Sequence, residues 1–293
     1  MLRAILLIAL ALGLLAAASA CATRSGSGDS AAAVPKRIVS LSPALTEILF
    51  AVGAGDRVVG VTQYCDFPEA AKSIPKVGGY VNPSVEAVLA LKPDLLVVSP
   101  GPGNRDAVLA IQRSGVRTEL FPSETLEESL AAIQAVAGVA GVASAGRELA
   151  AKVRARLDAV AVRAAKAPRV RTFFCIQIDP IIAAGKDTLP SQLLELAGGE
   201  NVVSARRYPR MDVEAVAAAR PELILQARMD VANRDGRIED AFWSRWPAIP
   251  AVARGRVVVL QDDRALRPGP RVAEAAEELE RILRADGAAA RAR

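Results

Sequence analysis

The chain has 293 residues, a formal net charge of +5 and no histidine. The missing histidine excludes serine–histidine and cysteine–histidine catalysis, histidine-based zinc sites and histidine-ligated haem, and we predict neither an enzyme nor a metal site. The Lys and Arg residues are scattered among Asp and Glu without a basic-aromatic stripe, so the positive charge indicates a solvated surface and no nucleic-acid partner.

The first segment has the features of an export signal. A single Arg near the N-terminus precedes an apolar run from Ala4 to Ala18. That run is about fifteen residues long, shorter than the roughly 20 residues that a membrane-spanning helix needs. We therefore predict a signal peptide over residues 1–20 and a periplasmic or otherwise extracytoplasmic location.

The cleavage region allows two interpretations. Ala18 and Ala20 fit ordinary signal cleavage, whereas Cys21 directly after a small residue resembles a bacterial lipobox, in which the thiol is lipidated. In the second interpretation, residues 21–35 are a flexible tether that anchors the protein to a membrane through Cys21.

Residues 36–142 alternate strand and helix patterns, which predicts a parallel sheet flanked by helices in an N-terminal lobe. The expected strands cover residues 37–41, 57–61, 94–99 and 117–121. The expected helices cover residues 45–53, 85–91 and 104–114, with another that begins near residue 124.

A long helix is expected over residues 143–167, a segment without proline. Leu149, Val153, Leu157 and Val160 recur at helical spacing and mark a buried stripe. Between two α/β lobes, such a helix is a stiff connector and not a flexible hinge.

Residues 168–293 repeat the alternation as a C-terminal α/β lobe. Strands are expected at 170–178, 222–227 and 256–261, and helices near 189–197, 212–220 and 270–285. The fold class predicted is α/β, with two Rossmann-like lobes that have parallel-rich central sheets and are joined by one long rigid helix.

One sixteen-residue pattern occurs twice, 128 residues apart. YVNPSVEAVLALKPDL begins at Tyr80 and YPRMDVEAVAAARPEL begins at Tyr208, with Tyr, Val, Glu, Ala, Val, Ala, Pro and Leu identical. An acid in the first turn of a helix commonly complements the helix dipole, which would explain Glu86 or Glu214 alone. The identical neighbours favour a paired docking face for a partner that carries two cations.

Candidate ligand-binding residues follow the expected strands, because ligands of parallel α/β sheets bind at the carboxyl ends of the strands. All three tyrosines of the chain are among them. A single loop tyrosine usually covers the end of a core, but three of three favour a ligand with both apolar and polar surface. The candidates are Ser42, Pro43, Tyr64, Tyr80, Tyr208, Asp263 and Arg267.

Cys65 and Cys175 leave two alternatives open. They are candidates for a disulfide in an oxidising compartment, or they are two unpaired thiols in different lobes.

Several motifs together resemble a known family. The run from RIVSLSPALTEILF to VEAVLALKPDLLVVS in the first lobe, and AGKDT, LLELAGGENV, FWSRWPAIPAVARGRVVVL and RPGPR in the second, are similar to ABC-transporter substrate-binding proteins of the helical-backbone class. The resemblance covers residues 36–285 and is nearest to the corrinoid-binding members, with siderophore and haem binders in the same class. It implies a monomer without cofactor that captures cobalamin or a related corrinoid between its lobes and delivers it to the permease dimer of an ABC importer.

The resemblance also implies roles for the candidate residues. Tyr64 and Tyr80 correspond to corrinoid contacts of the first lobe, Tyr208 to one of the second lobe, and Asp263 and Arg267 to polar residues of the cleft. Glu86 and Glu214 correspond to acids that dock on arginines of the permease. Tyr80 and Tyr208 stand where corrinoid binders have tryptophan, and Ser99 replaces another aromatic residue, so a ferric siderophore is the alternative ligand.

Overall fold

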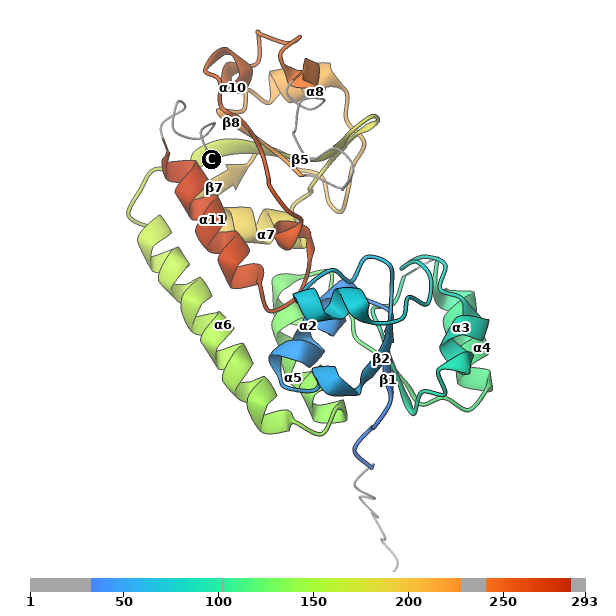
Figure 1. Ribbon diagram of the computed structural model, residues 1–293. Coiled ribbons are helices and arrows are strands. Elements are labelled where there is room, and N and C mark those ends of the chain that lie inside the picture. The colour runs from blue at the N-terminus through green and yellow to red at the C-terminus, as the bar shows by residue number, and fades with distance from the viewer. Residues whose placement is uncertain (1–32, 102, 228–240, 286–293) are drawn as a thin grey trace, which may run out of the picture. The chain divides into compact units, whose positions relative to one another are not determined.

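The computed structural model describes residues 33–101, 103–227 and 241–285. The predicted signal peptide and Cys21 lie outside the described residues. Contacts group Val34–Arg293 into one compact unit, which contains two β-sheets (Figure 1).

The first sheet is wholly parallel, with strand order β2-β1-β3-β4. Its central strands are fully buried, as expected where helices cover both faces of a parallel sheet. The strands are β1 (Ile38–Ser40), β2 (Val58–Val61), β3 (Leu95–Val98) and β4 (Thr118–Leu120). The helices are α2 (Pro43–Ala51), α3 (Val85–Ala90), α4 (Arg105–Arg113) and α5 (Leu126–Val139), with short 3-10 turns η1 (Gly55–Arg57) and η2 (Glu69–Ser73).

The second sheet has the order β6-β5-β8-β9, and β7 also pairs with β5. Among the described strands of this sheet, β6 pairs antiparallel with β5 and the other pairs are parallel. The strands are β5 (Val170–Ile178), β6 (Ile181–Ala183), β7 (Gly199–Asn201), β8 (Leu223–Gln226) and β9 (Val257–Val259). The helices are α7 (Leu189–Leu196), α8 (Val213–Ala218), α10 (Pro250–Ala253) and α11 (Val272–Arg284), with the 3-10 turn η3 (Arg264–Leu266).

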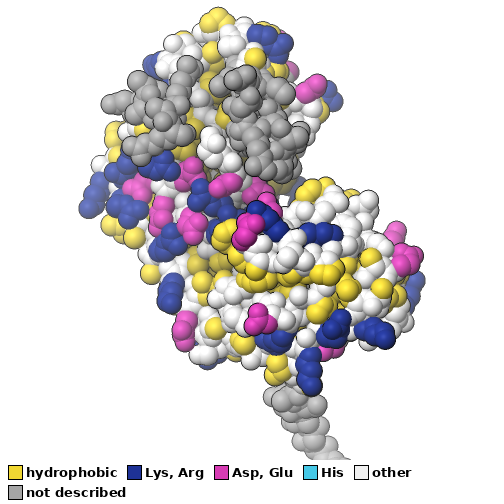
Figure 2. Space-filling view, viewed as in Figure 1, with side chains coloured by type: hydrophobic (Ala, Val, Ile, Leu, Met, Phe, Trp, Pro, Cys, Tyr) yellow, Lys and Arg dark blue, Asp and Glu magenta, His cyan; other side chains and the backbone are white. Residues whose placement is uncertain are grey.

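One helix, α6 (Ala143–Ala164), connects the two sheets along the chain. Its 22 residues extend about 33 Å at 1.5 Å per residue. It packs against α5 and α11, and charged side chains of both signs gather over α6 and α11 (Figure 2). Ion pairs join these helices, and the shortest are Arg156 with Glu277 at 2.8 Å and Arg163 with Glu280 at 2.6 Å.

The largest hydrophobic cluster is shared by both lobes. It includes Leu45 of α2, Ile133 of α5, Leu157 of α6, Leu193 of α7 and Leu279 of α11, all nearly inaccessible to solvent. Because bending at α6 would open this common core, the connection is stiff. The predicted α/β fold, with two parallel-rich sheets joined by one long helix, is confirmed.

The two copies of the repeat have the same local structure. Ser84 and Asp212 are the N-caps of α3 and α8, and each side chain accepts a hydrogen bond from the backbone N–H three residues later, at 3.1 and 2.7 Å. After each helix, Lys92 and Arg220 both have a φ of 47°. The sequence duplication is therefore also a duplication of backbone conformation.

Both described cysteines are free and buried, so the disulfide alternative for Cys65 and Cys175 is wrong. The Cys65 Sγ accepts a hydrogen bond from Thr46 Oγ1 at 3.3 Å, and the Cys175 Sγ donates to the Gln177 carbonyl at 3.1 Å. Each thiol lies in the interior of a different lobe.

Within the described residues, no helix combines the length and apolarity that crossing a membrane requires.

Candidate ligand-binding site

Three serine hydroxyls form a row at the carboxyl ends of neighbouring strands. Ser42 follows β1, Ser99 follows β3 and Ser123 follows β4. The Ser99 Oγ donates to the Ser42 Oγ at 3.1 Å, and the Ser123 Oγ donates to the Ser99 Oγ at 3.3 Å. Ser42 is the N-cap of α2 and Pro43 its first residue. The sequence analysis proposed Ser42 and Pro43 for the site but missed Ser123.

Tyr64 and Tyr80 lie on two loops that are bonded to each other. Tyr64 is in the turn after β2 and is 52% exposed, whereas Tyr80 is only partly exposed. The Gln63 N–H donates to the Gly78 carbonyl at 2.9 Å. Gly78 has a φ of 104°, a conformation that favours glycine. This connection keeps the two tyrosine loops next to each other.

The loop that carries Tyr208 is fixed by a close backbone contact. The Gly185 N–H donates to the Arg207 carbonyl at 2.7 Å. A Cβ atom at Gly185 would lie 2.5 Å from the Ala205 carbonyl oxygen, so only glycine fits there. Tyr208 itself is half exposed. The AGKDT motif thus positions the tyrosine of the second repeat.

Glu124 lies at a junction of the two lobes, although the sequence analysis did not identify it. Its carbonyl accepts a hydrogen bond from the Leu189 N–H at 3.1 Å, which connects the start of α5 to the start of α7. Its Oε1 lies 3.3 Å from Arg207 Nη2. Burial raises the pKa of the Tyr80 and Tyr208 phenols, and the charge of Glu124 is the second cause in each case. The two phenols therefore remain neutral near a common carboxylate.

Arg267 is engaged by groups of both lobes. Its Nε lies 2.6 Å from Asp263 Oδ2, its Nη1 lies 2.7 Å from Asp66 Oδ1, and its Nη2 donates to the Tyr64 carbonyl at 3.4 Å. Burial alone would lower the pKa of Arg267, but hydrogen bonds and charge from Asp66 and Asp263 raise it overall. The guanidinium stays charged and holds the Tyr64 loop.

A fully buried carboxylate lies beside this arginine. The Glu47 side chain in α2 is 0% exposed and accepts two hydrogen bonds from Arg271, at 2.6 and 2.9 Å. Arg267 Nη1 lies 3.3 Å from Glu47, and the Arg271 guanidinium stacks over the Phe67 ring at 4.2 Å. The only sequence signal for Glu47 was an acid among the apolar residues of an expected helix.

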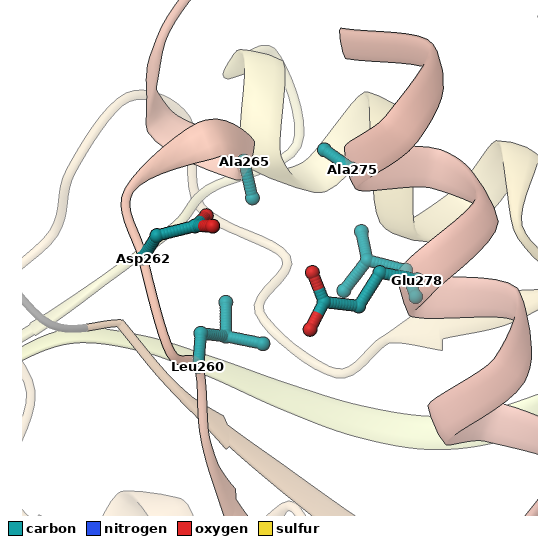
Figure 3. A pocket seen from close by; sticks show the side chains of 6 residues that line it. Leu260, Asp262, Ala265, Ala275 and Glu278 are labelled. Atoms are coloured by element: carbon teal, nitrogen blue, oxygen red, sulfur yellow. The ribbon is translucent and has the colours of Figure 1, made fainter. Parts of the chain in front are cut away.

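A small cavity lies beside Asp262, between η3 and α11 (Figure 3). The carboxylates of Asp262 and Glu278 border it, and Arg264 forms ion pairs with both, at 2.7 and 2.8 Å. Its volume of about 10 Å³ corresponds to roughly one water molecule. The cavity is therefore too small for an organic ligand.

Glu86 and Glu214 are exposed in the first turns of α3 and α8. The Glu86 Oε2 accepts a hydrogen bond from Ser84 Oγ at 3.1 Å. Neither glutamate belongs to an ion pair among the described residues. The described residues also contain no group of three or more cysteines and acids placed to hold a metal ion.

Known proteins resemble the chain over most of its length. The vitamin B12-binding protein of Vibrio campbellii is 30% identical over 247 residues, which cover 83% of this chain and 88% of that protein. The periplasmic vitamin B12-binding protein of Vibrio cholerae has a solved structure that matches with a TM-score of 0.72 at 28% identity, covering 85% of this chain and 97% of that one.

The structure of a periplasmic heme-binding protein matches with a higher TM-score. The apo form of the protein from Roseiflexus sp. RS-1 matches with a TM-score of 0.78 at 27% identity, covering 87% of this chain and 99% of that one. The backbone alone therefore does not discriminate between the two ligands. The model of the periplasmic binding protein family matches residues 38–264. The chain belongs to the periplasmic binding protein family.

Proposed function

We propose that this protein captures cobalamin or a related corrinoid between its two lobes and delivers it to an ABC importer. The observation that carries the proposal is the similarity, over 83% of the chain, to a relative named as a vitamin B12-binding protein. The three tyrosines in loops of both lobes support it, because a tyrosine offers a flat apolar face with a polar tip.

The proposed contacts divide into three kinds. Tyr64, Tyr80 and Tyr208 supply aromatic surface, and the serine row that begins at Ser42, with Pro43 beside it, supplies hydroxyls. Asp263 is the polar group of the second lobe, and Arg267 holds it in position. A stiff connection between the lobes limits the ordering that accompanies binding, which favours affinity.

Iron-bearing ligands are the alternative, either a ferric siderophore or haem. The chain has no histidine to ligate haem iron, so a tyrosine would have to do so as phenolate. The raised pKa values of Tyr80 and Tyr208 disfavour that anionic form. In this proposal no protein atom coordinates the metal of the corrinoid. Two neutral tyrosines are therefore more compatible with a corrinoid than with haem.

Calorimetric titration of the purified protein tests the ligand. We expect binding heat with cyanocobalamin and none with a ferric hydroxamate siderophore. Haem binding is followed in parallel by its visible absorbance. Absence of heat with cyanocobalamin, or tighter binding of either iron ligand, would overturn the proposal.

We also propose that Glu86 and Glu214 dock on paired cations of the permease dimer. Both carboxylates are exposed at equivalent points of the two copies of the repeat, which supports this role. The protein would act as a monomer in the periplasm, anchored through a lipid on Cys21, and would make or break no bond of its ligand.

Removing both carboxylates tests the docking. The double variant with Glu86→Ala and Glu214→Ala should bind cyanocobalamin normally but no longer stimulate ATP hydrolysis by the reconstituted transporter. Glu127→Ala is the matched control, since Glu127 is likewise an exposed acid in a first helical turn, that of α5. Loss of ligand affinity in the double variant, with coupling to the transporter intact, would contradict the docking role.

A further inference from the structure

We infer that Glu124 determines ligand selectivity: its carboxylate favours ligands with N–H donors and repels ligands that bring a carboxylate to the same position. The inference rests on the proposed function, since it assumes that the ligand lies between Tyr80 and Tyr208. It adds a residue for which neither the repeat nor the resemblance assigned a role.

The Glu124 carboxylate is accessible to a ligand. Its side chain is 69% exposed, although its backbone carbonyl is fixed by the bond from Leu189. Its Oε1 has Arg207 as its partner, at the rather long distance of 3.3 Å, and its Oε2 has no partner among the described residues. A carboxylate can accept about four hydrogen bonds, so most of its capacity is available.

Arg207 does not cancel the effect of Glu124 at either phenol. At the Tyr80 phenol, Glu124 is the charged group that raises the pKa, and no cation opposes it. At the Tyr208 phenol, the effect of Glu124 exceeds the opposing effect of Arg207, and Asp187 adds to it. Glu124 therefore acts as a negative charge on both phenols, and its exposed carboxylate lies next to Arg207 in the loop of Tyr208.

Candidate ligands differ in the groups that they would place near the Glu124 carboxylate. A corrinoid such as cyanocobalamin carries peripheral amides, which donate hydrogen bonds to a carboxylate. Haem carries two propionates and many siderophores carry carboxylates, which would place like charges near Glu124. Like charges brought together at a binding surface disfavour the wrong partner. Glu124 thus makes the protein selective for amide-bearing over acidic ligands, although its fold is shared by proteins that bind either kind.

The test compares cyanocobalamin with its monocarboxylic acid derivative, in which one peripheral amide is hydrolysed. The relevant derivative is the one whose carboxylate faces Glu124. We expect the unaltered protein to bind cyanocobalamin about tenfold more tightly than this derivative, because two like charges several ångströms apart at an exposed site repel each other by about that factor. Glu124→Gln should reduce this preference to about threefold or less. Arg207→Gln should increase it, because the carboxylate then lacks its cation.

Controls separate this inference from the proposed function. Glu127→Gln removes an exposed acid three residues away that pairs with Arg154, and it should leave the preference unchanged. Circular dichroism and the unfolding midpoint verify that each variant is folded. No binding of cyanocobalamin to the unaltered protein overturns the proposed function. Normal binding with a preference that Glu124→Gln and Arg207→Gln leave unchanged overturns only the role of Glu124.

Discussion

Two of the ionic contacts between the lobes differ strongly in burial. In the first, Glu47 is 0% exposed and is held by Arg267 and Arg271. In the second, Glu124 and Arg207 are 69% and 70% exposed. Removing one partner of a buried ion pair leaves an uncompensated charge, whereas an exposed pair contributes little to stability. The first contact therefore holds the lobes together, and the second is free to respond to a ligand.

The largest effect on stability is expected when the buried carboxylate of Glu47 is removed. Glu47→Ala should lower the free energy of unfolding by about 3 kcal/mol, because it leaves two largely buried guanidinium groups without their shared carboxylate. Chemical denaturation with urea measures the change. Glu47→Gln keeps the shape of the side chain and serves if the alanine variant does not fold; it should also be clearly destabilised.

The exposed acid Glu127 provides the control for this comparison. Glu127→Ala removes one partner of the exposed pair with Arg154 and should change the free energy of unfolding by no more than about 0.5 kcal/mol. If Glu47→Ala were as mild as this control, the buried contact would not be what holds the lobes in position.

The sequence predicted the fold better than it predicted these contacts. The alternation of strands and helices was enough to predict two parallel-rich sheets. The absence of proline over residues 143–167 was enough to predict the long helix. The strand β6 (Ile181–Ala183) was missed because three residues show no clear period. Glu47 was missed because its partners lie more than two hundred residues away, and Glu124 because only tertiary packing brings it near both tyrosines.

An effect of intermediate size is expected on the pKa values of the two repeat tyrosines when the exposed acid Glu124 is replaced. In Glu124→Gln, the pKa values of Tyr80 and Tyr208 should decrease toward the ordinary value of 10.0 but remain above it, because burial is the larger cause of both shifts. The absorbance of phenolate during alkaline titration measures this. Unchanged titration curves would mean that Glu124 does not act on the tyrosines.

The direction of this shift also affects stability at alkaline pH. A phenol whose pKa is raised in the folded state stabilises the fold below its unfolded pKa, and this stabilisation is lost as the pH rises through the folded pKa. The protein should therefore lose stability above about pH 10, and Glu124→Gln should lose less, since its tyrosines are less shifted.

The smallest effect is expected for the exposed pair itself. Arg207→Gln, Glu124→Gln and the double variant should each change the free energy of unfolding by less than about 1 kcal/mol at neutral pH, and the coupling from the double-mutant cycle should be smaller still. Added salt should reduce the coupling further, since both side chains are exposed to screening. A coupling of several kcal/mol would show that this contact also holds the lobes together, and the contrast with Glu47 would then disappear.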